Sequence, residues 1–150
     1  MRFLQLAGLV IGVAAGVAMF EPAYAANLVL ITADEAKLPP PKGAIAVNSR
    51  GVTRGPKIEL VSQAAVKSPA NIQLKFQTFG GAKVDVSAVQ ATYLRTPNVD
   101  LTSRIKPFVN EAGIELQSVE LPPGDHMLRI DIKDSDGRAA TTSFLLKVAQ

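Results

Sequence analysis

The chain has 150 residues, a net charge of +3 and no cysteine, so disulfides, a thiol nucleophile and a lipid anchor on cysteine are all excluded. Packing alone must therefore hold the fold. With about 25 residues set aside for export, the remainder is long enough for one domain with a proper core.

The first 25 residues have the pattern of an export signal. Arg2 supplies a positive start, residues 3–20 are apolar except for Gln5, and Ala-Tyr-Ala at residues 23–25 is a small-x-small cleavage site. We expect a signal peptide over residues 1–25, cleavage after Ala25, a periplasmic or secreted protein, and no stable transmembrane anchor afterwards. The alternative is an uncleaved membrane anchor, because the apolar run approaches the ~18–20 residues that span a bilayer.

Residues 26–55 predict a flexible, basic lead rich in proline and glycine. Three consecutive prolines at 39–41 and glycines at 43, 51 and 55 prevent any long regular element. One helical turn is expected before them, because Thr32 and Glu35 have the spacing of a capping box. The apolar residues 28–31 could pack on the domain or lie along a sheet edge, and the sequence does not decide between these.

The excess positive charge lies in this lead. Residues 37–57 hold five cations and no anion, whereas residues 58–150 hold ten cations and ten anions and so sum to zero. A basic segment on a neutral domain suits anionic envelope surfaces, where each cation is worth about 1 kcal/mol. The predicted contact residues are Lys42, Arg50, Arg54 and Lys57. The alternative is a solvated linker whose charges only keep it soluble.

The body, residues 56–150, reads as a series of short β-strands. Apolar and polar residues alternate over residues 72–77 and 89–93, and Gly80-Gly81 marks the turn between them. Residues 99–101 follow a break at Pro97. Pro107 lacks an N–H for pairing, so residues 105–109 should form an edge strand or an irregular crossing. Residues 114–121 suggest a further strand.

The last thirty residues read as a strand, a tight turn and a second strand. Apolar residues alternate with polar ones over 128–133 and 141–148, around Asp-Ser-Asp-Gly at 134–137. This phase directs Phe144 inward and Lys147 outward. The segment resembles the closing hairpin of bacterial immunoglobulin-like modules, which are β-sandwich domains of periplasmic and surface proteins. Residues 55–62 are similar to their opening strand and residues 68–72 to the lead into the second.

The expected fold is an all-β, immunoglobulin-like antiparallel β-sandwich of about seven strands. Short strands with turns every eight to fourteen residues are typical of such sandwiches. A barrel is the alternative, and a parallel α/β sheet is excluded because amphipathic helices are missing. The disulfide and tryptophan of antibody domains are absent. The resemblance covers about residues 56–149 and fixes no activity.

No residue pattern predicts catalysis. His126 is the single histidine, and at the start of a strand it is better explained as a structural residue than as a base. Asp134 and Asp136 are similar to the middle of a calcium loop, but Ile132 and Ser143 stand where further ligands are needed. A hairpin turn open to water explains both carboxylates. We therefore expect no catalytic residue, no metal and no cofactor.

Taken together, these features predict a non-catalytic exported interaction or accessory module of the cell envelope. Its partner would be another envelope protein or an anionic envelope surface, and export argues against nucleic acid. The alternative function is a binding module for an envelope polysaccharide or peptidoglycan, and a small enzyme is a third. A polysaccharide site needs exposed aromatic rings, for which only Phe79 and Phe108 are candidates.

Overall fold

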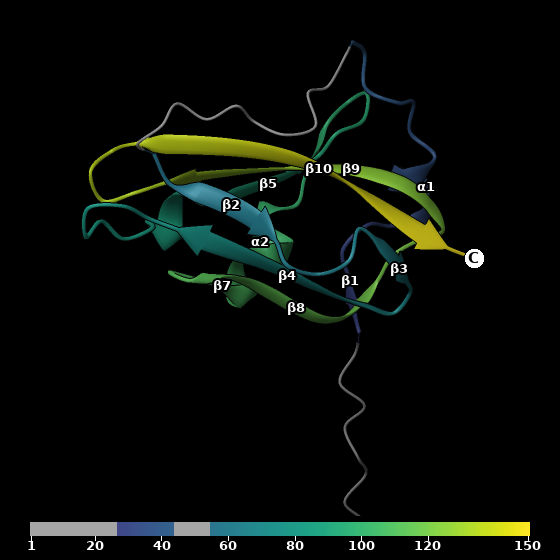
Figure 1. Cartoon of the computed structure of the whole chain (residues 1–150). Helices are drawn as coiled ribbons and strands as arrows, with labels where there is room; N and C mark the ends of the chain where they lie inside the picture. Colours follow the sequence, from purple (N-terminus) through teal and green to yellow (C-terminus); the bar gives the residue numbers. More distant parts are fainter. Residues whose placement is uncertain (1–26, 44–54) are drawn as a thin grey trace, which may run out of the picture.

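A computed structural model describes residues 27–43 and 55–150. The predicted signal peptide and its cleavage site lie outside the described residues, as do Arg50 and Arg54. None of the helices in the described part of the chain is long and apolar enough to cross a membrane. The described residues form short strands in two sheets that face each other (Figure 1).

The first sheet is built around two antiparallel strands of eight residues, β4 and β8. It has the order β1 (Leu28–Val29), β8 (Gly113–Glu120), β4 (Ala70–Gln77) and β2 (Lys57–Leu60), and β7 (Val109–Asn110) also pairs with β8. Buried and exposed residues alternate strictly along β4. This period of two places one face on the core and the other in water, as the sequence pattern predicts.

The second sheet is built around the long C-terminal hairpin. Its order is β3 (Ala65–Lys67), β10 (Ala139–Ala149), β9 (Gly124–Lys133), β5 (Gln90–Tyr93) and β6 (Val99–Asp100). Phe144 pairs with Leu128, and both side chains are buried, whereas Lys147 is exposed. The predicted strand phase of the hairpin is therefore confirmed.

The order of the strands is that of an immunoglobulin-like sandwich. After β1, the chain forms β2 in the first sheet and then crosses to the second, where β3 runs parallel to β10. β4 and β8 pair in the first sheet, while β5, β9 and β10 are neighbours in the second, as B and E and then C, F and G do in that fold. The two separate sheets exclude the barrel.

Residues 102–110 differ from the edge strand that the sequence allows. A helical turn, α2 (Thr102–Ile105), runs into a 3-10 turn, η2 (Lys106–Phe108), and only the two residues of β7 follow. Pro107 sits at the start of the 3-10 turn, where a missing N–H does no harm. Leu101 and Ile105 are buried, so the irregular crossing closes one side of the core.

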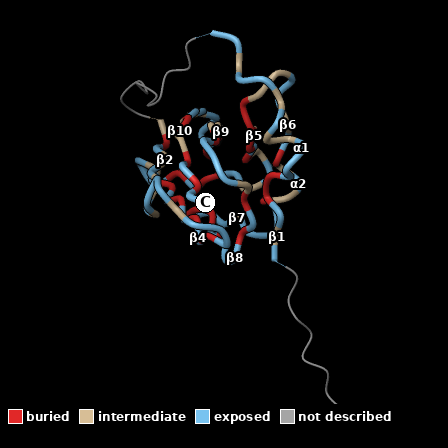
Figure 2. The backbone as a smooth tube through the Cα atoms, turned by 90° about the vertical axis from the view of Figure 1, so that its right-hand side faces the viewer, coloured by how far each residue is buried: buried red, intermediate tan, exposed pale blue. Residues whose placement is uncertain are grey.

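The core fills the space between the two sheets (Figure 2). Each large apolar side chain buried there is worth roughly 1.5–3 kcal/mol relative to an exposed one. The principal members are Ile72, Leu74, Phe76, Tyr93, Ile114, Leu116, Leu128, Ile130, Phe144 and Leu146.

An N-terminal arm, residues 28–36, is part of this sandwich. β1 pairs in parallel with the end of β8, and Leu30 and Ile31 behind it are buried in the core. The helical turn α1 (Ala33–Ala36) follows and carries the predicted capping box of Thr32 and Glu35. The expected flexible lead over residues 26–55 is therefore wrong for the arm, because its apolar residues pack on the domain.

Arg104 on α2 fastens the arm. Its Nη1 and Nη2 atoms donate to the two carboxylate oxygens of Glu35 at 2.8 and 2.7 Å, and Nη1 also donates to the carbonyl oxygen of Leu30 at 2.7 Å. Two parallel hydrogen bonds between a guanidinium and a carboxylate fix the relative orientation of the two groups as well as their separation. The hydrogen bond from Arg104 is the main cause that lowers the pKa of Glu35 to about 2.

Acid is expected to weaken the arm in a defined pH window. Because the pKa of Glu35 falls from 4.5 in the unfolded chain to about 2 on folding, its stabilisation is complete above pH 4.5 and is lost as the pH drops toward 2. Glu35→Gln should remove this contribution to the loss of folding stability at low pH. Urea unfolding at several pH values measures the change. Glu111→Gln, which alters an exposed ion pair, is the control. An unchanged acid loss in Glu35→Gln would contradict the assignment.

Candidate binding groove

A groove crosses the outer face of the second sheet, and we call it the sheet-face groove. Its volume is about 640 Å³. Its floor comes from β9 and β10, one wall from the loop between β5 and β6, and the other from residues 41 and 42. Its lining residues are Pro41, Lys42, Leu94, Arg95, Thr96, Pro97, Asn98, Arg129, Thr141 and Ser143.

Backbone carbonyls of the proline run hold the two walls together. The Thr96 N–H donates to the carbonyl oxygen of Pro39 at 3.0 Å, and the Thr96 hydroxyl donates to that of Pro40 at 3.1 Å. Because prolines have no N–H to donate, the proline run can form backbone hydrogen bonds only through its carbonyls. The segment that leaves α1 therefore runs beside the β5–β6 loop (Figure 1) and brings Lys42 to the groove.

Arg95 lines the groove, but its guanidinium is held against buried Tyr93, 5.0 Å from the centre of that ring. Its Nε donates to the Tyr93 hydroxyl at 2.7 Å, and its Nη2 donates to the carbonyl oxygen of Asp125 at 3.1 Å. Within residues 27–43 and 55–150, no carboxylate lies within ion-pair distance of Arg95 or Lys42. Arg129, by contrast, is paired with Asp131. Lys42 is therefore the cation on the groove wall that no described carboxylate neutralises.

A buried hydrogen-bond chain sets the position of Arg95. The His126 Nε2 atom lies 2.7 Å from the carbonyl oxygen of Pro122, which can only accept, so Nε2 carries the proton. Nδ1 then accepts from the Tyr93 hydroxyl at 2.9 Å, whose oxygen in turn accepts from Arg95. Burial is the main cause that lowers the pKa of His126, which keeps the ring neutral. His126 is a structural residue, as predicted.

The two predicted basic residues that the structure describes, Lys42 and Lys57, lie on different parts of the domain. Lys42 lies in the sheet-face groove on the second sheet. Lys57 begins β2 at the edge of the first sheet, with its Nζ 5.4 Å from the centre of the Phe79 ring. Arg50 and Arg54 lie outside the described residues, so the structure does not place them.

Sequence reasoning missed Arg95. It stands alone between a strand and a proline turn, and no spacing in the sequence marks it. Its role depends on Tyr93 and on the backbone of Asp125, thirty residues along the chain. The alternation over residues 89–93 could at most have placed Tyr93 in the core.

The Asp134 turn is confirmed, but one of its carboxylates is not open to water. The Asp134 side chain is fully buried, whereas Asp136 is exposed. Burial raises the pKa of Asp134, but hydrogen bonds from the Arg138 N–H and guanidinium and from the Asp136 N–H outweigh this and lower it. Because protein donors occupy both carboxylate oxygens, turn geometry and Arg138 explain this residue fully.

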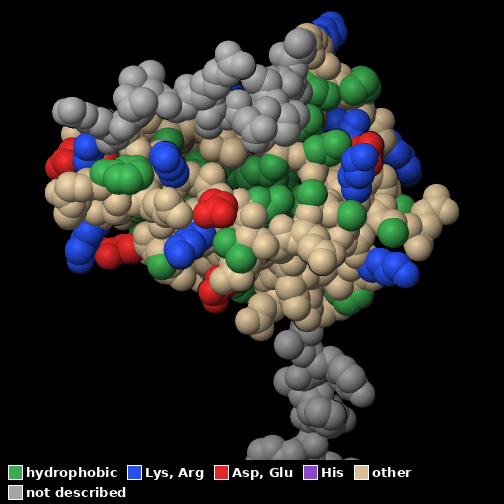
Figure 3. All heavy atoms as spheres, viewed as in Figure 1, with side chains coloured by type: hydrophobic (Ala, Val, Ile, Leu, Met, Phe, Trp, Pro, Cys, Tyr) green, Lys and Arg blue, Asp and Glu red, His purple; other side chains and the backbone are tan. Residues whose placement is uncertain are grey.

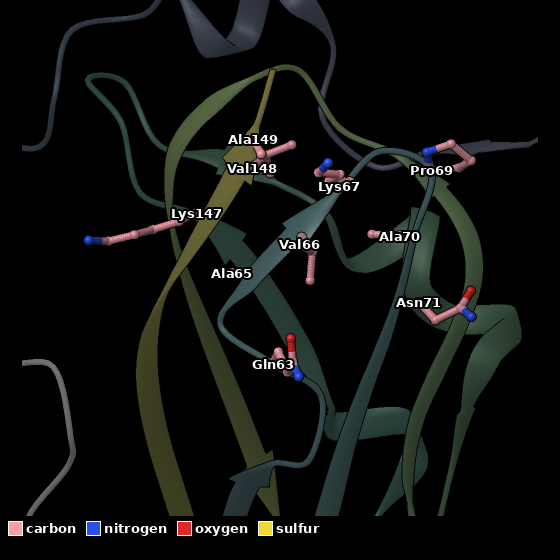
Figure 4. A pocket seen from close by; sticks show the side chains of 10 residues that line it. All are labelled: Gln63, Ala65, Val66, Lys67, Pro69, Ala70, Asn71, Lys147, Val148 and Ala149. Carbon is pink, nitrogen blue, oxygen red and sulfur yellow. The ribbon is translucent and has the colours of Figure 1, made fainter.

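A second hollow lies where the chain crosses from β2 to β3. It has a volume of about 620 Å³ between β3, β4 and β10 (Figure 4). In this close-up, Val66 points into the hollow, whereas Lys147 points away from it. In the space-filling view of Figure 3, hydrophobic side chains gather across the middle of the surface that faces the reader. The lining of the hollow combines small apolar residues such as Ala65 and Ala70 with the polar side chains of Gln63, Lys67 and Asn71.

The groups in the sheet-face groove can bind but are poorly suited to react. Fixed N–H donors and hydroxyls can hold an anionic or polar ligand. Both ring nitrogens of His126 are already engaged. In the part of the chain that the structure describes, His, Asp and Glu side chains form no group of three that could hold a metal ion.

Comparisons with known proteins add little to this description. No protein-family model and no curated protein matches the chain. Among solved structures, murine CRIg, an immunoglobulin-like domain, is similar over 63% of this chain and 96% of its own, with 9% sequence identity and a TM-score of 0.37. The fold assignment therefore rests on the strand order.

Proposed function

We propose that this chain is a non-catalytic, exported interaction module of the cell envelope that holds its partner in the sheet-face groove. One observation carries the proposal: the groove is an open surface hollow of about 640 Å³ with a polar lining that includes Asn98, Arg129 and Thr141, and Lys42 on its wall has no described carboxylate to neutralise it. A surface hollow lined by such groups is suited to hold a polar or anionic partner. The leader-like residues 1–25 support export.

Contact is favoured over catalysis by the state of the single histidine. His126 is 1% exposed, and its two nitrogens bond Tyr93 and the Pro122 carbonyl. A general base must reach its substrate within hydrogen-bond distance, directly or through one water. His126 would have to leave the core to do so.

The polysaccharide alternative has less support. Phe79 and Phe108 are 42% and 37% exposed, but they lie on the β4–β5 connection and on η2, respectively. Stacking on sugar rings requires an accessible aromatic face, and Lys57 lies over the ring of Phe79. The two rings therefore do not supply a shared platform.

Photo-crosslinking in the native cells tests the proposal. A photoreactive amino acid at Asn98, exposed on the groove wall, should capture a partner. The same group at Gln117, exposed on β8 of the first sheet, should not. Both variants should be matched for expression and for urea midpoint before comparison.

Capture at Asn98 alone would support the groove. Equal capture at Gln117, or capture at Gln117 alone, would move the interaction to the first sheet and refute the proposal. Fractionation of the same cells reports independently on export, which requires that the mature chain begin at Ala26.

A further inference from the structure

We infer that the second hollow, between β3 and β4, binds an extended segment of a partner protein as an added strand on the free edge of β3. In that segment an apolar residue, packed over Val66, alternates with an acidic residue beside Lys67. This surface is separate from the sheet-face groove, so the inference goes beyond the proposed function and does not depend on it. It is carried by the backbone of the β3 edge, the apolar floor of the hollow and the unmatched charge of Lys67.

The outer edge of β3 presents backbone groups that no described residue bonds. β3 ends its sheet and pairs with β10 alone, in parallel. The Lys147 N–H donates to the carbonyl oxygen of Ala64 at 2.7 Å, and this register turns the N–H and C=O of Val66 toward β10. Because such groups alternate along a strand, those of Ala65 and Lys67 point the other way. Among the described residues, no hydrogen bond occupies them.

The hollow exists because the chain changes sheets at this point. β2 pairs with residues 74–77 of β4, and the N–H groups of Val61 and Ser62 donate to the carbonyl oxygen of Gln73. The chain then crosses to the second sheet and becomes β3, so no described strand pairs with residues 70–72 on the side where β2 lies. The gap of about 620 Å³ between β3 and β4 therefore lies beside the free edge of β3 (Figure 4).

The floor of the hollow favours an apolar side chain. Val66 points into the hollow and is half-buried, and Ala70 and Val148, which also line it, are buried. In an added strand, the Cβ atom of the residue opposite Val66 would lie about 4.5–5.5 Å from that of Val66. An apolar residue there covers Val66 and gains the most from burial. Strand addition takes its affinity from main-chain bonds and its specificity from alternate side chains of this kind.

Lys67 sets the charge of the segment. Lys67 and Lys147 are both exposed, and the lining of the hollow includes no Asp or Glu. Lys147 pairs with Asp125 of β9, whereas the register partner of Lys67 is Ala149. An acidic residue opposite Lys67 therefore adds a favourable cross-strand pair that the described residues do not supply. Two copies joined edge to edge at β3 would instead bring two Lys67 side chains to one seam, which disfavours a second copy.

Peptide binding to the purified mature chain tests the inference. The probe is a short, end-blocked peptide in which Glu alternates with Val, and NMR titration should detect its binding at millimolar concentration or below. On binding, the N–H groups of Ala65 and Lys67 should shift and become protected from exchange, whereas that of Val66 is protected already in the free chain. A matched peptide with Gln in place of Glu should bind more weakly, by about fivefold at most.

N-methylation of the peptide separates backbone pairing from charge. Alternate residues of an added strand turn their N–H groups toward β3, and these are the Glu residues in an antiparallel strand and the Val residues in a parallel one. Methyl groups on that set should weaken binding about tenfold or more, because hydrogen bonds to β3 are lost. Methyl groups on the other set should have little effect. Equal loss from the two sets, or no loss from either, would overturn the inference.

Variants of the chain test the same contacts from the other side. Ala65→Pro removes one outward N–H and none of the bonds to β10, so the Glu peptide should bind about tenfold more weakly. Lys67→Glu should reverse the preference, so that a peptide with Lys in place of Glu binds better. Val66→Thr, similar in shape but polar, should weaken every peptide. Lys75→Glu, which alters an exposed cation of the first sheet, is the control and should bind as the parent does. Unfolding midpoints show whether each variant is folded.

The outcomes are independent of the proposed function, which crosslinking at Asn98 tests. If Ala65→Pro and Lys67→Glu bind the Glu peptide as the parent does, or if the peptide does not bind at millimolar concentration, the β3 edge does not receive an acidic strand. If sedimentation shows a dimer that Ala65→Pro dissociates, the occupant is a second copy and the inference is wrong. Protection of the Ala65 and Lys67 N–H groups by the Glu peptide, lost in the methylated set, is the result that supports it.

Discussion

Phe144→Ala is expected to lower the free energy of unfolding by about 3–5 kcal/mol, the usual loss for a buried phenylalanine. Phe144 pairs with Leu128 across the central hairpin, and its side chain is buried between the two sheets. Truncation leaves a cavity in contact with both sheets, which the paired strands can fill only in part. Urea unfolding followed by circular dichroism measures the loss.

Lys147→Ala is the matched control for this prediction. It lies three residues along the same strand, on the opposite face, and is exposed. Surface substitutions of this kind usually change stability by no more than about 0.5 kcal/mol. Similar losses from the two substitutions would mean that β10 is placed in the wrong phase.

Leu30→Ala is expected to cost about 2–5 kcal/mol, although Leu30 precedes the predicted domain boundary by more than twenty residues. The side chain is 2% exposed and packs with Ile72, Leu116 and other core residues from both sheets. A loss of this size would establish that the N-terminal arm belongs to the folding unit. The measurement is the midpoint of urea unfolding of the mature chain, with the denaturant dependence of the unfolding free energy (the m-value) unchanged by the substitution.

Val29→Ala provides the contrast within the same arm. Val29 is the preceding residue but is 42% exposed, so its truncation should cost little. If both substitutions are nearly neutral, the arm does not contribute to the core and the flexible lead predicted from composition was the better description.

The sequence was sufficient where structure depends on local pattern. Alternation over residues 126–148 predicts the hairpin because each strand buries one face, and the spacing of Thr32 and Glu35 predicts a cap that both side chains form. Pro107 correctly predicted an interruption of regular strand pairing. The missing N–H alone does not predict whether an edge strand or a helical turn stands there, and the structure has a 3-10 turn.

The sequence was insufficient where structure depends on distant partners. The arm is fixed by Arg104, which lies 69 residues from Glu35, and composition near the prolines gave no sign of that pairing. Asp134 looked like an exposed turn residue, but it forms a β-bridge with Val84, which lies far away in the sequence, and its side chain is fully buried. The groove itself was invisible in the sequence, since its lining comes from residues 41–42, 94–98, 129, 141 and 143, which meet only in the folded domain.

Hydrogen–deuterium exchange of the chain, free and in complex with the partner captured from cells, tests the central claim most directly. If the partner is held in the sheet-face groove, protection on binding should appear in residues 94–98 and 139–143, and β4 and β8 should be unchanged. Protection confined to β4 and β8, or to residues 63–71 at the second hollow, would contradict the account and place the interface elsewhere on the sandwich.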